Sequence, residues 1–339
     1  MTIQPPRSAL TPLTPARPTT DDVAQLAAGR VATTDEPDPT TLLTWADVIL
    51  VNSSGGKDSQ AMLSHLVALA AAAQVLHRIV VVHCDLGDVE WKGTRELAEE
   101  QAAAYGLRFE VVSRKQGDLI QQIKDRHHTL RANGDTTTPA WPSSQARYCT
   151  SAHKRGQVRP LMTRLVDEFT GRPGRPVRPV RILNCMGMRA EESPARKKRT
   201  MLELDQGASN GKRTVYTWLP LHTWPVKRVW SEIARSGLPY SPVYDWGMSR
   251  LSCSFCVLAS ERDLELAARL RPEKAAEMVG LERYVGHDFK KNLPIAEIVR
   301  RAEATDAAHG PAVRHPRGTA MAAHIGQART LDYLARSAA

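Results

Sequence analysis

Short apolar runs alternate with amphipathic segments through the first two thirds of the chain. The apolar runs, which predict strands, are 46–51 (ADVILV), 78–83 (RIVVVH), 108–112, 181–185 (RILNC) and 214–218. The amphipathic segments between the first four, which predict helices, are 58–73, 91–105 and 118–126. This alternation is typical of βα units. Because parallel crossovers are right-handed, it predicts a doubly wound, mostly parallel α/β sheet that binds ligands at the carboxyl ends of its strands.

The rest of the chain departs from this alternation. Four segments between positions 225 and 302 predict helices: 226–236, 261–270, 272–278 and 294–301. We therefore expect an α/β domain over 41–224 and a small helical subdomain over 225–302. Residues 1–40 hold seven prolines and predict a disordered arm with a short helix near 21–26. Residues 303–339 predict a tail with weak helical periodicity near 320–335, and 113–180 break the βα rhythm.

Composition narrows the class of partner. The 46 basic and 36 acidic residues give a net charge of +10, which favours a polyanionic partner such as nucleic acid or a nucleotide. No apolar run reaches the roughly 20 residues of a membrane span, and no signal-peptide core is present. Five scattered cysteines make no disulfide framework, so a cytoplasmic protein with reduced thiols is expected.

The strongest motif is the sequence VNSSGGKDS at 51–59, which follows the first strand and opens a helix. Gly55 and Gly56 let the backbone approach a ligand closely, and Lys57 supplies a cation. Asp58 and Ser59 are expected at the helix N-cap, where free amides and the helix dipole favour phosphate. The motif is not a GxxxxGK[ST] loop, because an acidic residue follows the lysine. The alternative is an ordinary glycine turn with a capping aspartate.

The hexapeptide SGGKDS at 54–59 resembles the PP-loop of the ATP pyrophosphatases, the adenine nucleotide α-hydrolase superfamily. The resemblance implies an enzyme that binds ATP with Mg²⁺, splits it between the α and β phosphates and leaves AMP on an acceptor. It implies catalytic roles for Lys57 and Asp58. It also implies that the nucleotide is held by Ser53, Ser54, Gly55, Gly56, Lys57, Asp58 and Ser59.

Further segments between about 45 and 275 resemble the phosphoadenosine-phosphosulfate-reductase-like branch of that superfamily. The stretch HCDLG at 83–87 is similar to its Asp-Thr-Gly motif and implies that Asp85 lies beside the nucleotide. The stretch GMRAEES at 187–193 is similar to its Gly-x-Arg-x-x-Glu-Ser motif. It implies a catalytic Arg189, whose guanidinium suits phosphate oxygens, with Gly187, Glu192 and Ser193 also at the nucleotide. An ordinary turn and a solvated charged loop are the alternatives. Trp224 and Trp230 are expected to pack.

Three cysteines suggest sulfur or metal chemistry. Cys253 and Cys256 form a CxxC pair, and Cys149 lies in the stretch RYCTSAHK, which also resembles this branch. Three functions compete: a [4Fe–4S] cluster on the three thiolates with one open iron, a zinc ion with His153, or a persulfide-carrying dithiol. The resemblance favours the cluster. Cys84 and Cys185 are expected to be buried, or one of them to relay sulfur.

The order of the cysteines resembles the sulfur-insertion proteins of bacterial DNA phosphorothioation systems, of the Ssp and Dnd types. This resemblance implies adenylation of a DNA backbone oxygen, then sulfur insertion with a cysteine desulfurase as donor. The net charge and the basic run at 171–181 would contact the backbone in a salt-dependent way. The alternatives are a tRNA-thiolating enzyme, a phosphoadenosine-phosphosulfate-reductase-type oxidoreductase, against which the cysteine-free tail argues, and a nucleotide-binding scaffold without hydrolysis. A homo-oligomer is left open.

Overall fold

A single six-stranded sheet forms the centre of the protein, whose computed structural model describes residues 17–28, 37–171 and 176–337. The strand order is β3-β2-β1-β4-β6-β5. The strands are β1 (Val48–Asn52), β2 (Ile79–Asp85), β3 (Arg108–Ser113), β4 (Val180–Met186), β5 (Leu202–Leu204) and β6 (Arg213–Trp218). Every pair is parallel except β5 with β6, so the predicted mostly parallel sheet is confirmed.

The order of the strands fixes where a ligand can bind. From β1 the chain moves outward through β2 to β3 and then returns to place β4 on the other side of β1. The connections that leave the carboxyl ends of β1 and β4 therefore run in opposite directions, which opens a crevice between them. Residues 54–59, which we call the PP-loop after the motif that they resemble, follow β1, and the motif at 187–193 follows β4.

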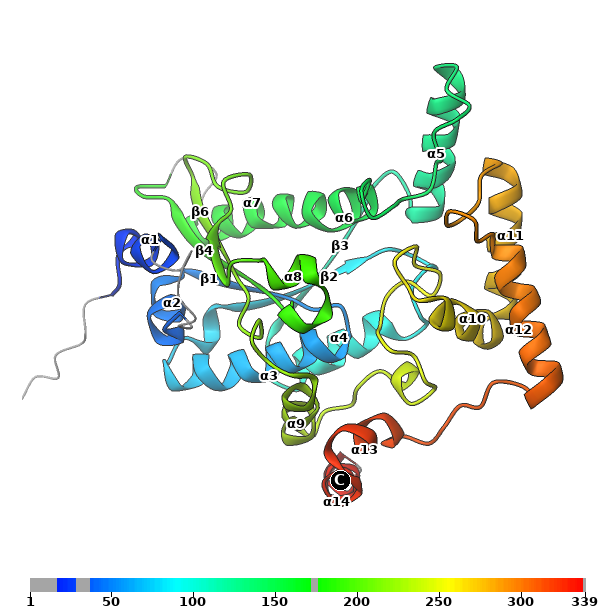
Figure 1. Cartoon of the computed structure of the whole chain (residues 1–339). Coiled ribbons are helices and arrows are strands. Elements are labelled where there is room, and N and C mark those ends of the chain that lie inside the picture. Colours follow the sequence, from blue (N-terminus) through cyan, green and yellow to red (C-terminus); the bar gives the residue numbers. More distant parts are fainter. Residues whose placement is uncertain (1–16, 29–36, 172–175, 338–339) are drawn as a thin grey trace, which may run out of the picture.

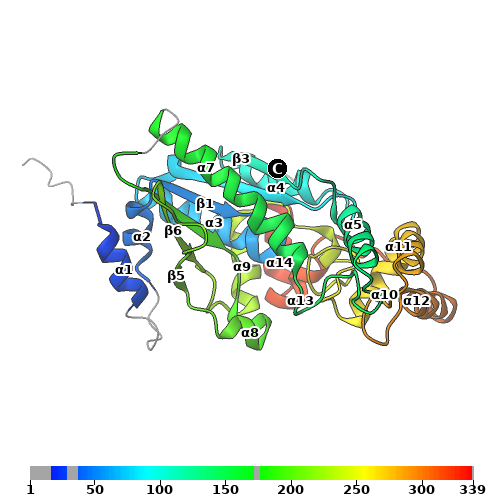
Figure 2. The ribbon, with the colours of Figure 1, turned by 90° about the horizontal axis from the view of Figure 1, so that it is seen from above.

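Helices cover both faces of the sheet (Figures 1 and 2). One face carries α3 (Lys57–Ala72), α4 (Thr94–Ala103) and, against α3, α9 (Val226–Ser236). The other face carries α7 (Gly156–Thr170), which contacts β2, β3 and β4. Successive side chains of β1 alternate between these layers: Ile49 and Val51 join the core on the α3 side, and Val48 and Leu50 join the core on the α7 side.

Helix α7 lies in the stretch that was expected to break the βα rhythm. Its buried residues recur at helical spacing: Val158, Leu161, Met162, Leu165 and Val166. Pro160 lies inside it, and a π-helical turn at Ser151–Arg155 joins it to the short α6 (Tyr148–Thr150). The basic run at 171–181 lies partly outside the described residues.

A second, separate core holds the helical subdomain together. Its helices are α10 (Glu261–Leu270), α11 (Pro272–Val285) and α12 (Ile295–His309), and α5 (Leu119–Ala132) lies beside them (Figure 1). The predicted segments 118–126, 272–278 and 294–301 are therefore the first parts of longer helices. Fully buried Leu264 and Ile295 centre this core.

Short helices at both ends pack onto the α3 side of the sheet. They are α1 (Thr20–Ala28), α2 (Pro39–Trp45), α13 (Thr319–Ile325) and α14 (Gln327–Ser337). Gly326, with φ +86°, separates α13 from α14, so the periodicity near 320–335 corresponds to two helices. The rest of the arm predicted over 1–40, at 1–16 and 29–36, lies outside the described residues. In the described ranges, no helix has both the length and the apolar character needed to cross a membrane.

Candidate functional site

The PP-loop connects the end of β1 to the start of α3. Gly55 has φ +69°, and a Cβ at this position would lie 2.9 Å from the Thr94 carbonyl oxygen, so only glycine fits. The N-cap of α3 is Gly56, which has no side chain to accept a capping hydrogen bond. The prediction that Asp58 and Ser59 occupy the N-cap is wrong, because the helix begins at Lys57, one residue before Asp58. The positive end of the helix dipole at this point favours an anion.

Hydroxyl oxygens accept hydrogen bonds from several amides around this loop. The Ser54 amide donates to Ser59 Oγ at 3.2 Å, and the Gly55 amide donates to Ser53 Oγ at 3.4 Å. The Lys57 amide donates to the Tyr244 hydroxyl at 3.0 Å. Three amides of the loop are therefore held by hydroxyl oxygens of the protein itself.

The three predicted catalytic side chains form one chain of ion pairs. Lys57 Nζ lies 3.1 Å from Asp58 Oδ2, and Arg189 Nε lies 2.5 Å from Asp58 Oδ1. Lys57 and Arg189 are only 7% and 4% exposed. Burial lowers the pKa of Lys57, but Tyr244 and Asp58 outweigh it and raise the pKa above its ordinary value. Both cations are therefore held charged beside the loop.

The motif after β4 contacts the PP-loop directly. A Cβ on Gly187 would lie 2.9 Å from the Asp58 carbonyl oxygen and 3.0 Å from the Ser59 amide nitrogen, so the two backbones touch. Glu192 accepts a hydrogen bond from the Arg189 amide at 2.9 Å. Ser193 caps α8 (Pro194–Lys197). Glu192 and Ser193 thus shape the loop that carries Arg189.

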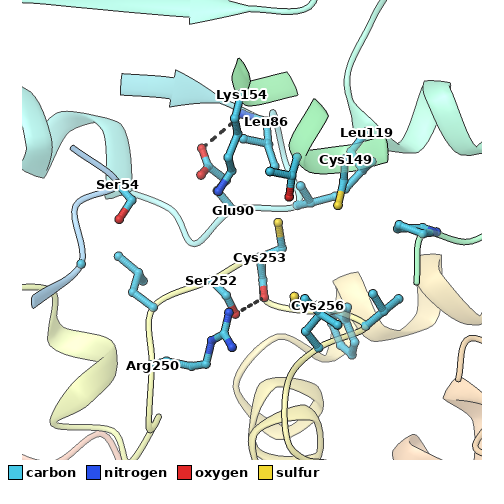
Figure 3. Close-up of a pocket in the computed structure, with 18 of the residues that line it drawn as sticks. Ser54, Leu86, Glu90, Leu119, Cys149, Lys154, Arg250, Ser252, Cys253 and Cys256 are labelled. Atoms are coloured by element: carbon cyan, nitrogen blue, oxygen red, sulfur yellow. Dashed lines mark hydrogen bonds between the residues drawn. The ribbon is translucent and has the colours of Figure 1, made fainter. Parts of the chain in front are cut away.

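One pocket opens between the PP-loop and the helical subdomain (Figure 3). The predicted nucleotide-binding residues that line it are Ser54, Gly56, Lys57, Asp58, Ser59, Gly187 and Glu192. Those that do not line it are Ser53, Gly55, Asp85, Arg189 and Ser193. Asp85 Oδ1 accepts a hydrogen bond from the Gly87 amide at 2.8 Å, so this carboxylate shapes the turn after β2.

The same pocket is lined by Cys149, Cys253 and Cys256 (Figure 3). Burial raises the pKa of the Cys253 thiol to about 12, and the neighbouring Cys256 and Cys149 act in the same direction. Lys154 opposes this rise. The structure thus places Cys149 on the same pocket as the CxxC pair, from which it is far apart in the sequence.

The arrangement of possible ligands bears on the competing metal sites. Within 17–28, 37–171 and 176–337, no group of three or more His, Cys, Asp or Glu side chains is placed to hold a metal ion. His153, the expected zinc ligand, does not line the pocket of the three thiols, and its Nε2 lies 2.8 Å from Gln122 Oε1. In a [4Fe–4S] cluster each thiolate binds a different iron, so the three sulfurs need not converge on one point.

The two remaining thiols lie at strand ends. Cys185 is fully buried, as expected. Cys84 is half-buried, and burial raises the pKa of its thiol to about 11. Trp224 and Trp230 are buried in the core, which confirms their expected packing role.

Sequence reasoning missed Tyr244, which joins the two sides of the pocket. Its hydroxyl accepts hydrogen bonds from the amide of Lys57 at 3.0 Å and from the amide of Leu251 at 3.3 Å. Its ring lies under Lys57, with Nζ 5.2 Å from the ring centre. No local sequence pattern indicates this role, because Lys57 is distant from Tyr244 in the sequence and Leu251 lies outside any motif.

Comparison with known proteins gives partial matches. Residues 178–259 match the model of the phosphoadenosine phosphosulfate reductase domain. An uncharacterized 37.8 kDa protein of Escherichia phage 186 is 30% identical over 168 residues, 48% of this chain and 46% of that protein. The adenosine 5′-phosphosulfate reductase of Lysinibacillus sphaericus is 33% identical over 70 residues, 21% of this chain and 28% of that enzyme.

Among solved structures, the phosphoadenylyl-sulfate reductase of Candida auris aligns with a TM-score of 0.41 and 17% identity. That alignment covers 69% of this chain and 95% of the reductase. The chain spans about half the length of the phage relative that it matches. Over residues 178–259, which carry Gly187, Arg189 and the CxxC pair, this chain is therefore similar to the phosphoadenosine phosphosulfate reductase domain.

Proposed function

We propose that this protein is an ATP pyrophosphatase that adenylates an acceptor and prepares it for sulfur insertion. One observation carries the proposal: a single pocket is lined on one side by the PP-loop and on the other by three thiols. The likeness to the phosphoadenosine phosphosulfate reductase domain supports nucleotide-using sulfur chemistry.

Residues on the nucleotide side of the pocket would bind the phosphates of ATP and orient them for the reaction. The N-terminal end of α3 and the ammonium of Lys57 would hold the phosphates of ATP. Asp58 and Glu192, which line the pocket, would hold Mg²⁺ together with phosphate oxygens. An acceptor oxygen attacks the α-phosphorus, the bond to the bridging oxygen of the β-phosphate breaks, and pyrophosphate leaves. Such transfers depend mainly on alignment and charge stabilisation. Lys57 would provide these directly, and Arg189, behind the pocket lining, would act through its ion pair with Asp58.

The thiol side would supply the sulfur. Cys149, Cys253 and Cys256 would hold a [4Fe–4S] cluster, which when bound offers an open iron for a sulfur atom beside the nucleotide. A cysteine desulfurase would be the source of that sulfur. The acceptor we favour is a DNA backbone phosphate, with a tRNA base as the alternative; mass spectrometry of DNA and tRNA from cells with and without the gene separates the two.

Pyrophosphate release tests the nucleotide half. Purified protein incubated with ATP, Mg²⁺ and nucleic acid should release pyrophosphate and AMP, and Lys57→Ala should lower the rate by about a hundredfold or more, as loss of a charge-stabilising group does. Lys212→Ala, an exposed lysine outside the pocket, serves as the control. Release of ADP and inorganic phosphate would contradict the proposal.

Anaerobic purification tests the thiol half. The protein should carry iron and sulfide and show the brown colour of an iron–sulfur protein, and Cys149→Ala should lose it. Cys185→Ala is the matched control, since Cys185 is buried away from the pocket. A colourless protein with stoichiometric zinc would exclude the cluster.

A second candidate is the reductive cleavage of adenosine 5′-phosphosulfate. The identity with adenosine 5′-phosphosulfate reductases favours it. Sulfite release from that substrate with a thiol reductant, in the absence of pyrophosphate release from ATP, would select this function.

A further inference from the structure

The two sides of the pocket differ in how their charges are balanced. On the nucleotide side every lining cation has a carboxylate partner: Lys57 pairs with Asp58, and Arg196 pairs with Glu192. Arg189, just behind the lining, pairs with Asp58 and also with Glu191, so three carboxylates face these three cations. This side is therefore close to electrically neutral before any ligand arrives.

The thiol side carries three cations without such partners. Arg147, Lys154 and Arg250 all line the pocket, and in the described part of the chain none of their side chains makes an ion pair or a hydrogen bond. Lys154 and Arg250 lie on opposite sides of Cys253 (Figure 3). Arg147 stands two residues before Cys149. The unpaired charges thus line the pocket together with the thiols.

One carboxylate lies on this side, and it has other partners. Glu90 Oε2 lies 3.4 Å from His83 Nε2 and accepts a hydrogen bond from the Leu86 amide at 3.4 Å. Three cations against one carboxylate leave an excess of positive charge. A concave site with unbalanced charge of one sign concentrates ligands of the opposite sign.

The exposure of these cations indicates the kind of anion that can reach them. Arg147 and Lys154 are exposed and Arg250 is half-buried, so the group lies at the mouth of the pocket. A long polymer can therefore place one backbone phosphate there without entering the pocket. Thr150, which also lines the pocket, adds a hydroxyl of the kind that contacts phosphates in nucleic-acid complexes.

We propose that Arg147, Lys154 and Arg250 form a second anion subsite that holds a phosphodiester of a nucleic-acid backbone beside the thiols while ATP occupies the PP-loop. This proposal rests on the function proposed above and assigns its acceptor to a separate set of residues. The basic run at 171–181 is not needed for it.

The test replaces all three cations at once. Binding of a short fluorescein-labelled DNA duplex is measured by fluorescence anisotropy at several salt concentrations. The triple variant Arg147→Gln, Lys154→Gln, Arg250→Gln should weaken binding by about tenfold or more, and the slope of log affinity against log salt should fall by about two to three. The matched control is Lys115→Gln, Lys212→Gln, Lys227→Gln, which removes the same charge from exposed positions outside the pocket.

Besides nucleic-acid binding that the triple substitution leaves unchanged, three results would overturn the subsite. The first is an equal loss of duplex affinity in the control variant, which would show that the effect depends only on net charge. The second is an equal loss of affinity for a non-hydrolysable ATP analogue in the triple variant, which would show that the two sides are not separate. The third is weaker binding of adenosine 5′-phosphosulfate with duplex binding intact, since the same cations would then hold a sulfate.

A parallel assay with single-stranded RNA of the same sequence shows which nucleic acid the subsite prefers. Tighter binding of either polymer that depends on the three cations supports the proposal. Duplex and RNA binding that both ignore the triple substitution reject it, even where wild-type protein still releases pyrophosphate. Failure of the subsite and failure of the proposed ATP chemistry are thus distinguishable.

Discussion

At the scale of single residues, burial controls which thiols of this protein can react. Cys84 lies at the end of β2, where burial raises the pKa of its thiol to about 11, against an ordinary value of 9.0. Lys154 lowers this pKa and Glu90 raises it. Only the thiolate is a good nucleophile, so Cys84 is held in its unreactive form near neutral pH.

We predict that Cys84 of the metal-free folded protein alkylates slowly at pH 8, roughly a hundredfold slower than in the denatured chain. Because the folded pKa lies above the unfolded one, burial of this thiol stabilises the protein below about pH 9. That stabilisation is lost as the pH rises towards 11. Iodoacetamide labelling followed by peptide mass spectrometry, with and without urea, measures both rates. Equal rates in the two states would contradict the burial argument and leave Cys84 available as a sulfur relay.

At the scale of secondary-structure elements, the site depends on how closely β4 approaches α3. Gly187, which follows β4, lies at the point of contact, because its backbone touches the backbone of Asp58 and Ser59 in α3. The ion pair between Asp58 and Arg189 is made across the same contact. The geometry of the nucleotide side is therefore set by a junction of two elements rather than by the PP-loop alone.

Gly187→Ala should push the two elements apart. We expect a loss of about 1–3 kcal/mol in stability from overpacking and a weaker affinity for ATP, because the start of α3 must shift. Isothermal titration with an ATP analogue and thermal unfolding measure the two effects. Gly211→Ala is the control, since an added Cβ there meets nothing within 4 Å. An unchanged affinity in Gly187→Ala would show that the junction tolerates a side chain.

Elements with a strong local pattern could be predicted from the sequence, and contacts between them could not. The apolar strands and α3 were recognised because their side-chain periods are clear. Strand β5 was missed because it has only three residues, and α7 was missed although its apolar spacing was present, because Pro160 and Gly156 interrupt it. The PP-loop and the CxxC pair carry motifs, whereas Tyr244, Lys154 and Arg250 reach the pocket only through tertiary packing.

At the scale of the whole molecule, the C-terminal helices are part of the main core. Tyr333 of α14 and Met321 of α13 are fully buried beside residues of α3 and α9. The hydroxyl of Tyr333 donates to the Leu238 carbonyl at 3.1 Å. Asp245 accepts from the Ala320 amide at 2.8 Å, one residue after Tyr244. The end of the described chain therefore supports the segment on which the pocket tyrosine stands.

Tyr333→Ala should destabilise the protein by about 3–5 kcal/mol, as other large-to-small core substitutions do. Leu331→Ala on the same helix should have little effect, because Leu331 is 57% exposed. Differential scanning calorimetry of the two variants measures the difference. A small effect of both would mean that α14 is docked only loosely in solution.

The shared hydroxyl of Tyr244 limits how this protein can be rebuilt. It accepts one hydrogen bond from the amide at the start of α3 and another from an amide just before the CxxC pair. Both segments are therefore held by the same oxygen atom. A chimera that keeps residues 41–224 and takes its helical region from another protein would need an equivalent hydroxyl at the same point. Without it, the start of α3 and the segment before the CxxC pair would lose the hydrogen bonds that hold both of them to one oxygen atom.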